Sequence, residues 1–114
     1  MAEESLYYGD YLQLDKLLSA QALESERAGK PVHDEMLFVI VHQTYELWFK
    51  QILWEIDDLL AIFGRELVDE RDMGTAVSRL RRIVEIQKVL IQQVAVLETM
   101  TPLDFLDFRD HLFP

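Results

Sequence analysis

Cysteine is absent from the 114-residue sequence, which excludes disulfides and thiolate metal sites. Basic residues are also scarce: 21 Asp and Glu side chains oppose 11 Lys and Arg, for a formal net charge of −10. This balance argues against nucleic acid as a partner, because phosphate binding depends on clustered Lys and Arg. The one basic cluster, Arg79, Arg81 and Arg82, is predicted to be a solvated helix face.

Long apolar runs are missing as well. No stretch reaches the roughly 18 uncharged residues of a membrane span, and the first ten residues lack the basic and apolar regions of a secretory signal. We therefore expect a cytoplasmic protein with no membrane partner. Half of the residues are hydrophobic, which argues against disorder. A chain of this length forms one small domain or a piece of a larger one.

What the sequence does contain is helical periodicity, and no segment alternates with a period of two. The prediction is an all-α fold of long antiparallel helices, a helical bundle with short connections. We expect a single segment over residues 1–114, with an arm over 1–13 and helices over 14–114. A short helix should begin near residue 14, and a loop should follow around residues 27–33.

Two long helices are predicted next, over residues 35–63 and 74–100. Asp34 is expected to cap the first helix and Gly64 to end it. Thr101 and Pro102 should start a further helix, with Thr101 as its cap and Pro102 in its first position. A stripe on the second long helix is expected to form a seam for helix-on-helix packing. Its members are Val77, Leu80, Val84, Gln87, Ile91 and Val94.

The stretch "MLFVIVHQTYELWFKQ", residues 36–51, places His42 in the middle of an apolar run. Glu46 follows one turn later on the same helix face. A metal site is one interpretation, with Glu35, Glu55 and His33 as further ligands. However, neither HExxH nor a pair of ExxH motifs is present. Residue chemistry by itself favours a core histidine satisfied by a hydrogen bond.

Arg109 and the N-terminal tyrosines raise similar questions. Arg109 lies in "DFLDFRDHLF" between apolar side chains, where a guanidinium can pair bidentately with a carboxylate. That carboxylate belongs either to a ligand or to a neighbouring aspartate, and residue chemistry alone favours the aspartate. The segment "YYGDYLQLD" presents exposed aromatics, which we expect to dock on the chain's own core or on a neighbouring subunit.

Three segments together resemble a known family. They are "YGDYLQLDKLLSAQ", "HDEMLFVIVHQTYELWFKQIL" and "LETMTPLDFLDFRDHL", which in this order and spacing closely resemble the N-terminal part of the tryptophan 2,3-dioxygenase family. The resemblance covers nearly the whole chain from Tyr8 onward. It implies an all-α haem protein, homotetrameric, that inserts both atoms of O2 into the indole ring of L-tryptophan to give N-formylkynurenine. That reaction belongs to tryptophan catabolism by the kynurenine pathway.

The resemblance also implies roles for individual residues. His42 falls on the family's distal-pocket histidine, facing the substrate's indole N–H as the catalytic side chain. Phe38 lines the indole pocket, and Arg109 binds the substrate carboxylate. Further pocket contacts fall on Phe105 and Leu112. The family segment that reaches into a neighbouring subunit's active site falls on Tyr8, Tyr11 and Leu12.

The resemblance has one departure that concerns the haem iron. None of His33, His42 and His111 matches the family's proximal iron ligand, so no metal ligand is expected in this chain, which we interpret as a fragment or a naturally short relative. Two alternatives stay open beside the dioxygenase. One is a haem-dependent aromatic hydroxylase or monooxygenase of the same fold. The other is a non-catalytic helical association module.

Overall fold

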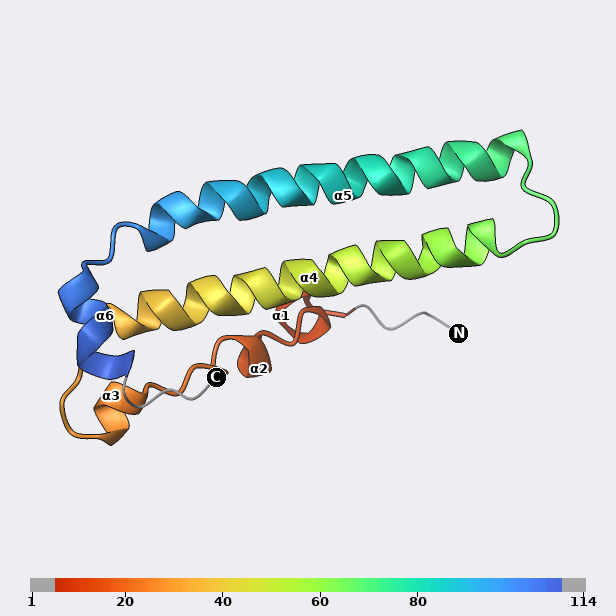
Figure 1. Cartoon of the computed structure of the whole chain (residues 1–114). Coiled ribbons are helices and arrows are strands. Elements are labelled where there is room, and N and C mark those ends of the chain that lie inside the picture. The colour runs from red at the N-terminus through yellow and green to blue at the C-terminus, as the bar shows by residue number, and fades with distance from the viewer. Residues whose placement is uncertain (1–5, 110–114) are drawn as a thin grey trace.

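The computed structural model describes residues 6–109, and within them six helices and no strand, which confirms the all-α prediction. The two long helices, α4 (Glu35–Phe63) and α5 (Glu70–Leu97), lie antiparallel as a hairpin (Figure 1). The short α6 (Pro102–Arg109) lies at one end of this hairpin, beside the start of α4. The remaining helices are single turns: α1 (Tyr8–Tyr11), α2 (Leu14–Leu17) and α3 (Glu24–Arg27).

The bounds of α4 agree with the sequence-based prediction, but the cap at its N-terminus does not. Gly64 ends the helix, with its amide donating to the Leu60 carbonyl oxygen at 2.9 Å. The predicted cap at Asp34 is wrong, because that side chain makes no capping hydrogen bond. Glu35, the first helical residue, is buried instead and reaches back to α3. This residue therefore ties the start of α4 to the preceding loop.

Helix α5 begins four residues earlier than residue 74, where the prediction placed its start, and it ends at Leu97 rather than at residue 100. The signal for its start is a capping box between Asp69 and Asp72. The Asp72 amide donates to Asp69 Oδ1 at 2.8 Å, and the Asp72 carboxylate accepts from the Asp69 amide. The predicted start of α6 is confirmed, with the Asp104 amide donating to Thr101 Oγ1 at 3.2 Å.

The core between α4 and α5 uses side chains of α5 that lie next to the predicted packing stripe. On α5 the buried side chains are Ala76, Ile83 and Ile86, and Ala76 and Ile83 pack with Leu59 of α4. The predicted stripe is exposed, with Leu80 at 48% and Ile91 at 73%. Helix α5 carries two adjacent apolar stripes with the same heptad spacing, and the periodicity of one helix does not tell which stripe faces its partner.

Polar side chains also join the two long helices. Tyr45 donates its hydroxyl to the Leu90 carbonyl oxygen at 2.6 Å. Glu55, only 3% exposed, accepts from Arg82 at 3.1 Å, and Arg79 donates to Asp58 at 2.9 Å. The basic cluster thus does more than form a solvated face, because Arg79 and Arg82 bind carboxylates across the hairpin. A buried carboxylate without such partners would be strongly destabilising.

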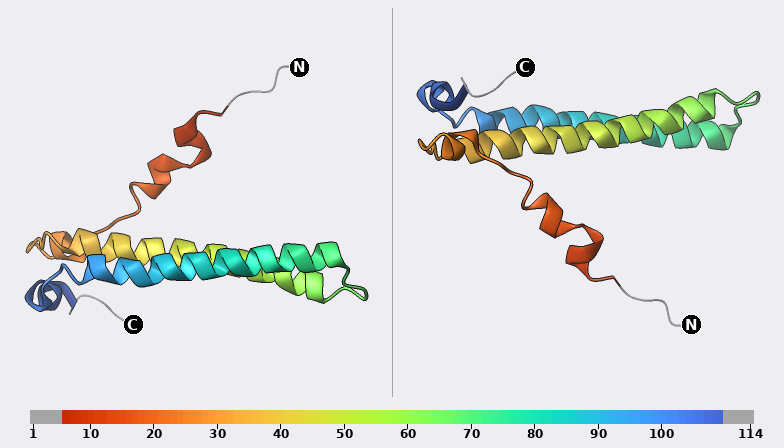
Figure 2. Two further views of the ribbon diagram at one scale, coloured as in Figure 1. Left: turned by 90° about the horizontal axis from the view of Figure 1, so that it is seen from above. Right: turned by 90° about the horizontal axis from the view of Figure 1, so that it is seen from below.

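The predicted helix from residue 14 extends for only one turn, as α2, and the structure describes a non-helical segment before α3. None of the residues of α1 or α2 is buried. A helix this short is not stable in water without packing. Helices α1 and α2 stand away from the hairpin, on the side opposite to α6 (Figure 2).

The molecule is elongated. Its Cα radius of gyration is 19.8 Å, against about 13 Å expected for a compact domain of this length. Within residues 6–109 no single helix is long and apolar enough to cross a membrane; α5 and α6 would qualify only as a pair, and they are bent by 93°.

Candidate functional site

Four aromatic rings gather where α6 meets the start of α4. We call Phe38, His42, Phe105 and Phe108 the aromatic cluster. The ring centroids of Phe38 and His42 are 4.1 Å apart, and those of Phe38 and Phe105 are 5.7 Å apart. The family resemblance predicted one pocket for Phe38, His42 and Phe105, although Phe105 lies more than sixty positions after the other two. The structure brings those three together.

The position of the cluster follows from the helices that carry it. Phe38 and His42 are one turn apart on α4, and therefore point the same way. Phe105 lies on α6, which contacts both α3 and α4. The Thr101 cap sets the start of α6, and the chain bends by 93° between α5 and α6, so that α6 lies across the end of the hairpin (Figure 1).

His42 has a defined hydrogen bond. Its Nδ1 atom lies 2.7 Å from the carbonyl oxygen of Phe38. A carbonyl oxygen only accepts, so in the neutral ring Nδ1 carries the proton and donates it. Nε2 then holds the lone pair and can accept a hydrogen bond. His42 is exposed, which leaves this second nitrogen available to an incoming donor.

Arg109 is the last described residue and closes α6. It follows Phe105 by four residues, so the two share a helix face. It is the one basic residue of this helix, which also carries Asp104 and Asp107, and its side chain is exposed. A cation at the edge of an aromatic cluster suits a ligand that has both an aromatic ring and a carboxylate.

Phe108 is a member of the cluster that sequence analysis missed. It is completely buried, at 0% exposure. Its ring meets Phe38 edge-on at 5.2 Å and Phe105 edge-on at 5.6 Å. The spacing of Phe105 and Phe108, three positions apart in "DFLDFRD", was the available signal, because such pairs lie on neighbouring parts of one helix face.

Two further networks hold the surroundings of the cluster, and both were missed. Glu35 accepts from the amides of Glu24 and Ser25, each at 2.9 Å. Gln43, next to His42, donates to the Ala20 carbonyl oxygen at 2.8 Å and accepts from Gln21 at 2.9 Å. The side-chain amide of Gln43 thus connects residues 20 and 21, which follow α2, to helix α4.

The predicted arm residues are exposed on the described part of the chain. Tyr8 is 74% exposed and Tyr11 is 70% exposed, and Leu12 is exposed as well. Helices α1 and α2 leave the hairpin on the side opposite to α6, so these residues lie away from the chain's own aromatic cluster (Figure 2). Leu112 and His111 fall outside the described residues.

The alternative metal site does not form among residues 6–109, where no group of three His, Cys, Asp or Glu side chains could hold a metal ion. Glu35 binds α3, and Glu55 binds arginine. These two carboxylates are therefore bound in separate parts of the fold.

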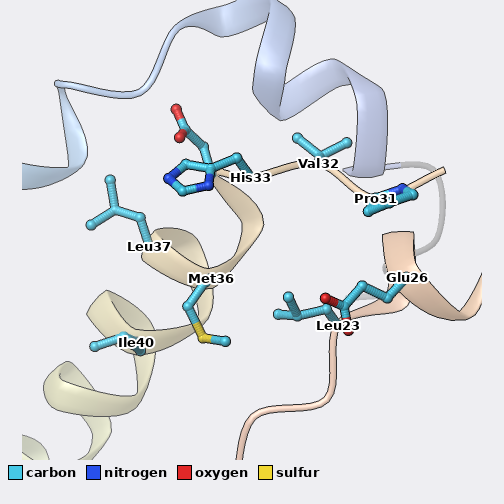
Figure 3. A pocket seen from close by; sticks show the side chains of 9 residues that line it. Leu23, Glu26, Pro31, Val32, His33, Met36, Leu37 and Ile40 are labelled. Carbon is cyan, nitrogen blue, oxygen red and sulfur yellow. The ribbon is translucent and has the colours of Figure 1, made fainter.

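A hollow of about 820 Å³ lies near the cluster but does not include it. It is formed by α3, the loop that carries Pro31 and His33, and the first turns of α4 (Figure 3). Met36 and Ile40 line it, and they alternate with Phe38 and His42. Residues two positions apart point to opposite sides of a helix, so the hollow and the aromatic cluster lie on different faces of α4.

The fold and this site define the chain as an all-α segment in which a helical hairpin presents an aromatic cluster with one histidine and a nearby arginine. Comparison with known proteins identifies its family. The tryptophan 2,3-dioxygenase family model matches residues 1–114, and the chain belongs to that family.

Curated relatives agree with this assignment. The chain is 62% identical over 109 residues to tryptophan 2,3-dioxygenase of Bdellovibrio bacteriovorus, covering 96% of the chain and 30% of that protein. It is 58% identical over 114 residues to tryptophan 2,3-dioxygenase B of Danio rerio, covering 99% of the chain and 28% of that protein. It is 55% identical over 111 residues to tryptophan 2,3-dioxygenase of Alteromonas mediterranea, covering 97% of the chain and 31% of that protein. The chain thus spans about 30% of the length of these relatives.

Proposed function

We propose that this chain forms part of the substrate pocket of a haem-dependent tryptophan 2,3-dioxygenase, which inserts both atoms of O2 into the indole ring of L-tryptophan to give N-formylkynurenine. The observation that carries the proposal is the convergence of Phe38, His42 and Phe105 at the end of the hairpin, with Arg109 one turn beyond Phe105. The family match over residues 1–114 supports it. The haem-loaded enzyme that contains this chain is called the holoenzyme below.

Each pocket residue has a task that its chemistry suits. Phe38 and Phe105 offer ring faces to the indole, and aromatic pairs of this kind stabilise a complex by about 0.5–1.5 kcal/mol beyond simple burial. His42 accepts the indole N–H at Nε2, because its Nδ1 is already bound to the Phe38 carbonyl oxygen. The Arg109 guanidinium binds the substrate carboxylate. Leu112 is proposed as one more apolar contact.

The pocket also controls access of water. The rings of the cluster form an apolar wall, and an apolar wall keeps water away from the substrate's reacting edge. Because His42 binds the indole and Arg109 binds the carboxylate, the substrate has a single bound orientation. Such positioning can lower a barrier by several kcal/mol, on the order of 7–11 kcal/mol in the most favourable cases.

Haem, when bound, supplies the activation of oxygen. The cluster would suit a pocket beside such a group, since it combines apolar rings with one histidine whose Nδ1 is bound to the backbone. We place the iron ligand outside this chain. Under this proposal the chain binds and orients the substrate, and contributes no ligand to the metal.

We further propose that the holoenzyme is a homo-oligomer, tetrameric as the family resemblance implies, in which Tyr8, Tyr11 and Leu12 enter the pocket of a neighbouring subunit. Support comes from the exposure of these residues and from the departure of α1 and α2 on the side opposite to α6 (Figure 2). An arm that cannot cover its own cluster in this arrangement is suited to covering another one.

Isotope labelling tests the reaction. The holoenzyme is incubated with L-tryptophan under ¹⁸O2, and the mass of the product is measured. A dioxygenase places both labelled atoms in N-formylkynurenine, whereas a monooxygenase or hydroxylase places one in the product and releases the other as water. A protein that binds no haem and gives no product would instead be a helical association module.

A further inference from the structure

Phe108 is the most deeply buried aromatic residue of the described chain, and it lies behind two rings of the proposed pocket. It is inaccessible to solvent, whereas Phe38 and Phe105 are half-buried. A residue with no exposed surface does not meet a substrate that arrives from solvent. Any effect of Phe108 on binding therefore passes through the rings that it touches.

The contacts of Phe108 join two helices. Its ring is edge-on to Phe38 of α4 at 68° and edge-on to Phe105 of its own helix α6 at 84°. Phe38 and Phe105 themselves are 5.7 Å apart at 37°, a tilted arrangement. The Phe108 ring thus packs against both, so that neither can move back into the protein without displacing it. Close-packed interiors transmit such constraints, because they contain few voids to absorb a shift.

We propose that Phe108 is a positioning residue that sets the separation of Phe38 and Phe105, and thereby the size of the aromatic ring that the pocket accepts. The inference rests on the proposed function, since it assigns a determinant of substrate selection to the same pocket. Phe108 also fixes the rotation of α6 at the residue before Arg109. Its loss should therefore weaken the binding of both the indole ring and the carboxylate of the substrate.

A purely structural role makes a different prediction. If Phe108 only fills space, its truncation should destabilise the protein but leave the choice between substrates unchanged. Ile83 provides the matched control, because it is buried in the α4–α5 core and belongs to none of the contacts of the aromatic cluster. Comparing Phe108→Leu with Ile83→Ala separates an effect on protein stability from an effect on the choice between substrates.

The experiment measures kcat/KM of the holoenzyme for L-tryptophan and for a tryptophan methylated on its benzene ring. With Phe108→Leu, KM for L-tryptophan should rise by about tenfold, which is less than the roughly 10²-fold cost of displacing a binding group by about 1 Å. The ratio of kcat/KM for the methylated substrate to that for L-tryptophan should rise by about tenfold. The reason is that the smaller leucine leaves space for Phe38 and Phe105 to move apart and admit one more methyl group. Ile83→Ala should lower the melting temperature and leave this ratio unchanged.

A second variant covers the case in which Phe108→Leu does not assemble. Phe108→Met places a flexible side chain of similar volume at the site, and is tolerated better in cores. It should shift the ratio in the same direction by a smaller factor. A ratio within about twofold of wild type in the variants that load haem would overturn the inference while the proposed function stands. If wild-type holoenzyme oxygenates neither substrate, the proposed function itself fails.

Discussion

His42 Nδ1 lies 2.7 Å from the carbonyl oxygen of Phe38, one helical turn earlier on α4. The rings of the same two residues are also in contact, with centroids 4.1 Å apart and planes tilted by 32°. The backbone of a pocket residue therefore decides which nitrogen of the histidine accepts a hydrogen bond. With Nδ1 bound to Phe38, Nε2 is the ring nitrogen left to accept a hydrogen bond.

This arrangement predicts a substrate-dependent effect of His42→Ala. The variant should lose kcat moderately with a milder change in KM, because one neutral hydrogen bond contributes about 1 kcal/mol, or roughly fivefold. A tryptophan methylated on the indole nitrogen has no N–H to donate. Its kcat/KM in the holoenzyme should therefore fall much less on His42→Ala than that of L-tryptophan. Equal losses for the two substrates would show that His42 does not bind the indole N–H.

The buried carboxylate of Glu35 predicts a local change at the N-terminus of α3. Glu35→Ala removes the acceptor of the Glu24 and Ser25 amides. Leaving buried donors unsatisfied destabilises a protein by about 1–3 kcal/mol each. Amide hydrogen exchange at Ser25 should accelerate strongly. Glu46→Ala, an exposed glutamate on the same helix, is the control and should leave that exchange rate unchanged.

From the hydrogen bonds of Gln43 we predict that this side chain protects the N-terminal segment from proteolysis. Gln43→Leu removes the bonds to Ala20 and Gln21 and should release the N-terminal segment. Two neutral hydrogen bonds contribute about 2 kcal/mol together, so tryptic cleavage after Lys16 in the holoenzyme should accelerate by roughly tenfold or more. Gln92→Leu, on the exposed surface of α5, should not change the rate. Identical cleavage of both variants would mean that Gln43 does not hold the arm.

Exposed apolar side chains on the long helices predict self-association of the 114-residue chain. Trp54 is 71% exposed and Leu60 is 66% exposed on α4, while Ile91 is 73% exposed on α5. Large apolar side chains exposed in this number drive association. Sedimentation at tens of micromolar should show oligomers, and replacing Trp54 and Ile91 with glutamate should reduce them. A compact monomer that binds no dye specific for exposed apolar surface would contradict this expectation.

Several features of the fold could be predicted because each has a local cause. The limits of α4 follow from its apolar run and from Gly64, and the start of α6 follows from Thr101 and Pro102. The start of α5 was missed because its capping box uses an aspartate at the third position, where glutamate or glutamine is the usual partner.

Other features depend on distant contacts that one helix does not encode. Val84 and Ile83 are adjacent and both apolar, yet only Ile83 faces α4. Phe108 is buried because α6 folds back on α4, which periodicity within α6 does not show. The roles of His42 and Arg109 came from the family resemblance, since their chemistry alone favoured an ordinary structural role for each.

Kinetics of Arg109→Ala in the holoenzyme test the central claim most directly. A guanidinium bound to a carboxylate is a charge-assisted contact that contributes roughly 1.5–3 kcal/mol or more. KM for L-tryptophan should therefore rise by about tenfold or more, well beyond the change for His42→Ala. Arg109→Lys should restore little, because a point charge does not reproduce the planar fork of the guanidinium. A KM for Arg109→Ala within about twofold of wild type would contradict the account and make Arg109 a structural residue.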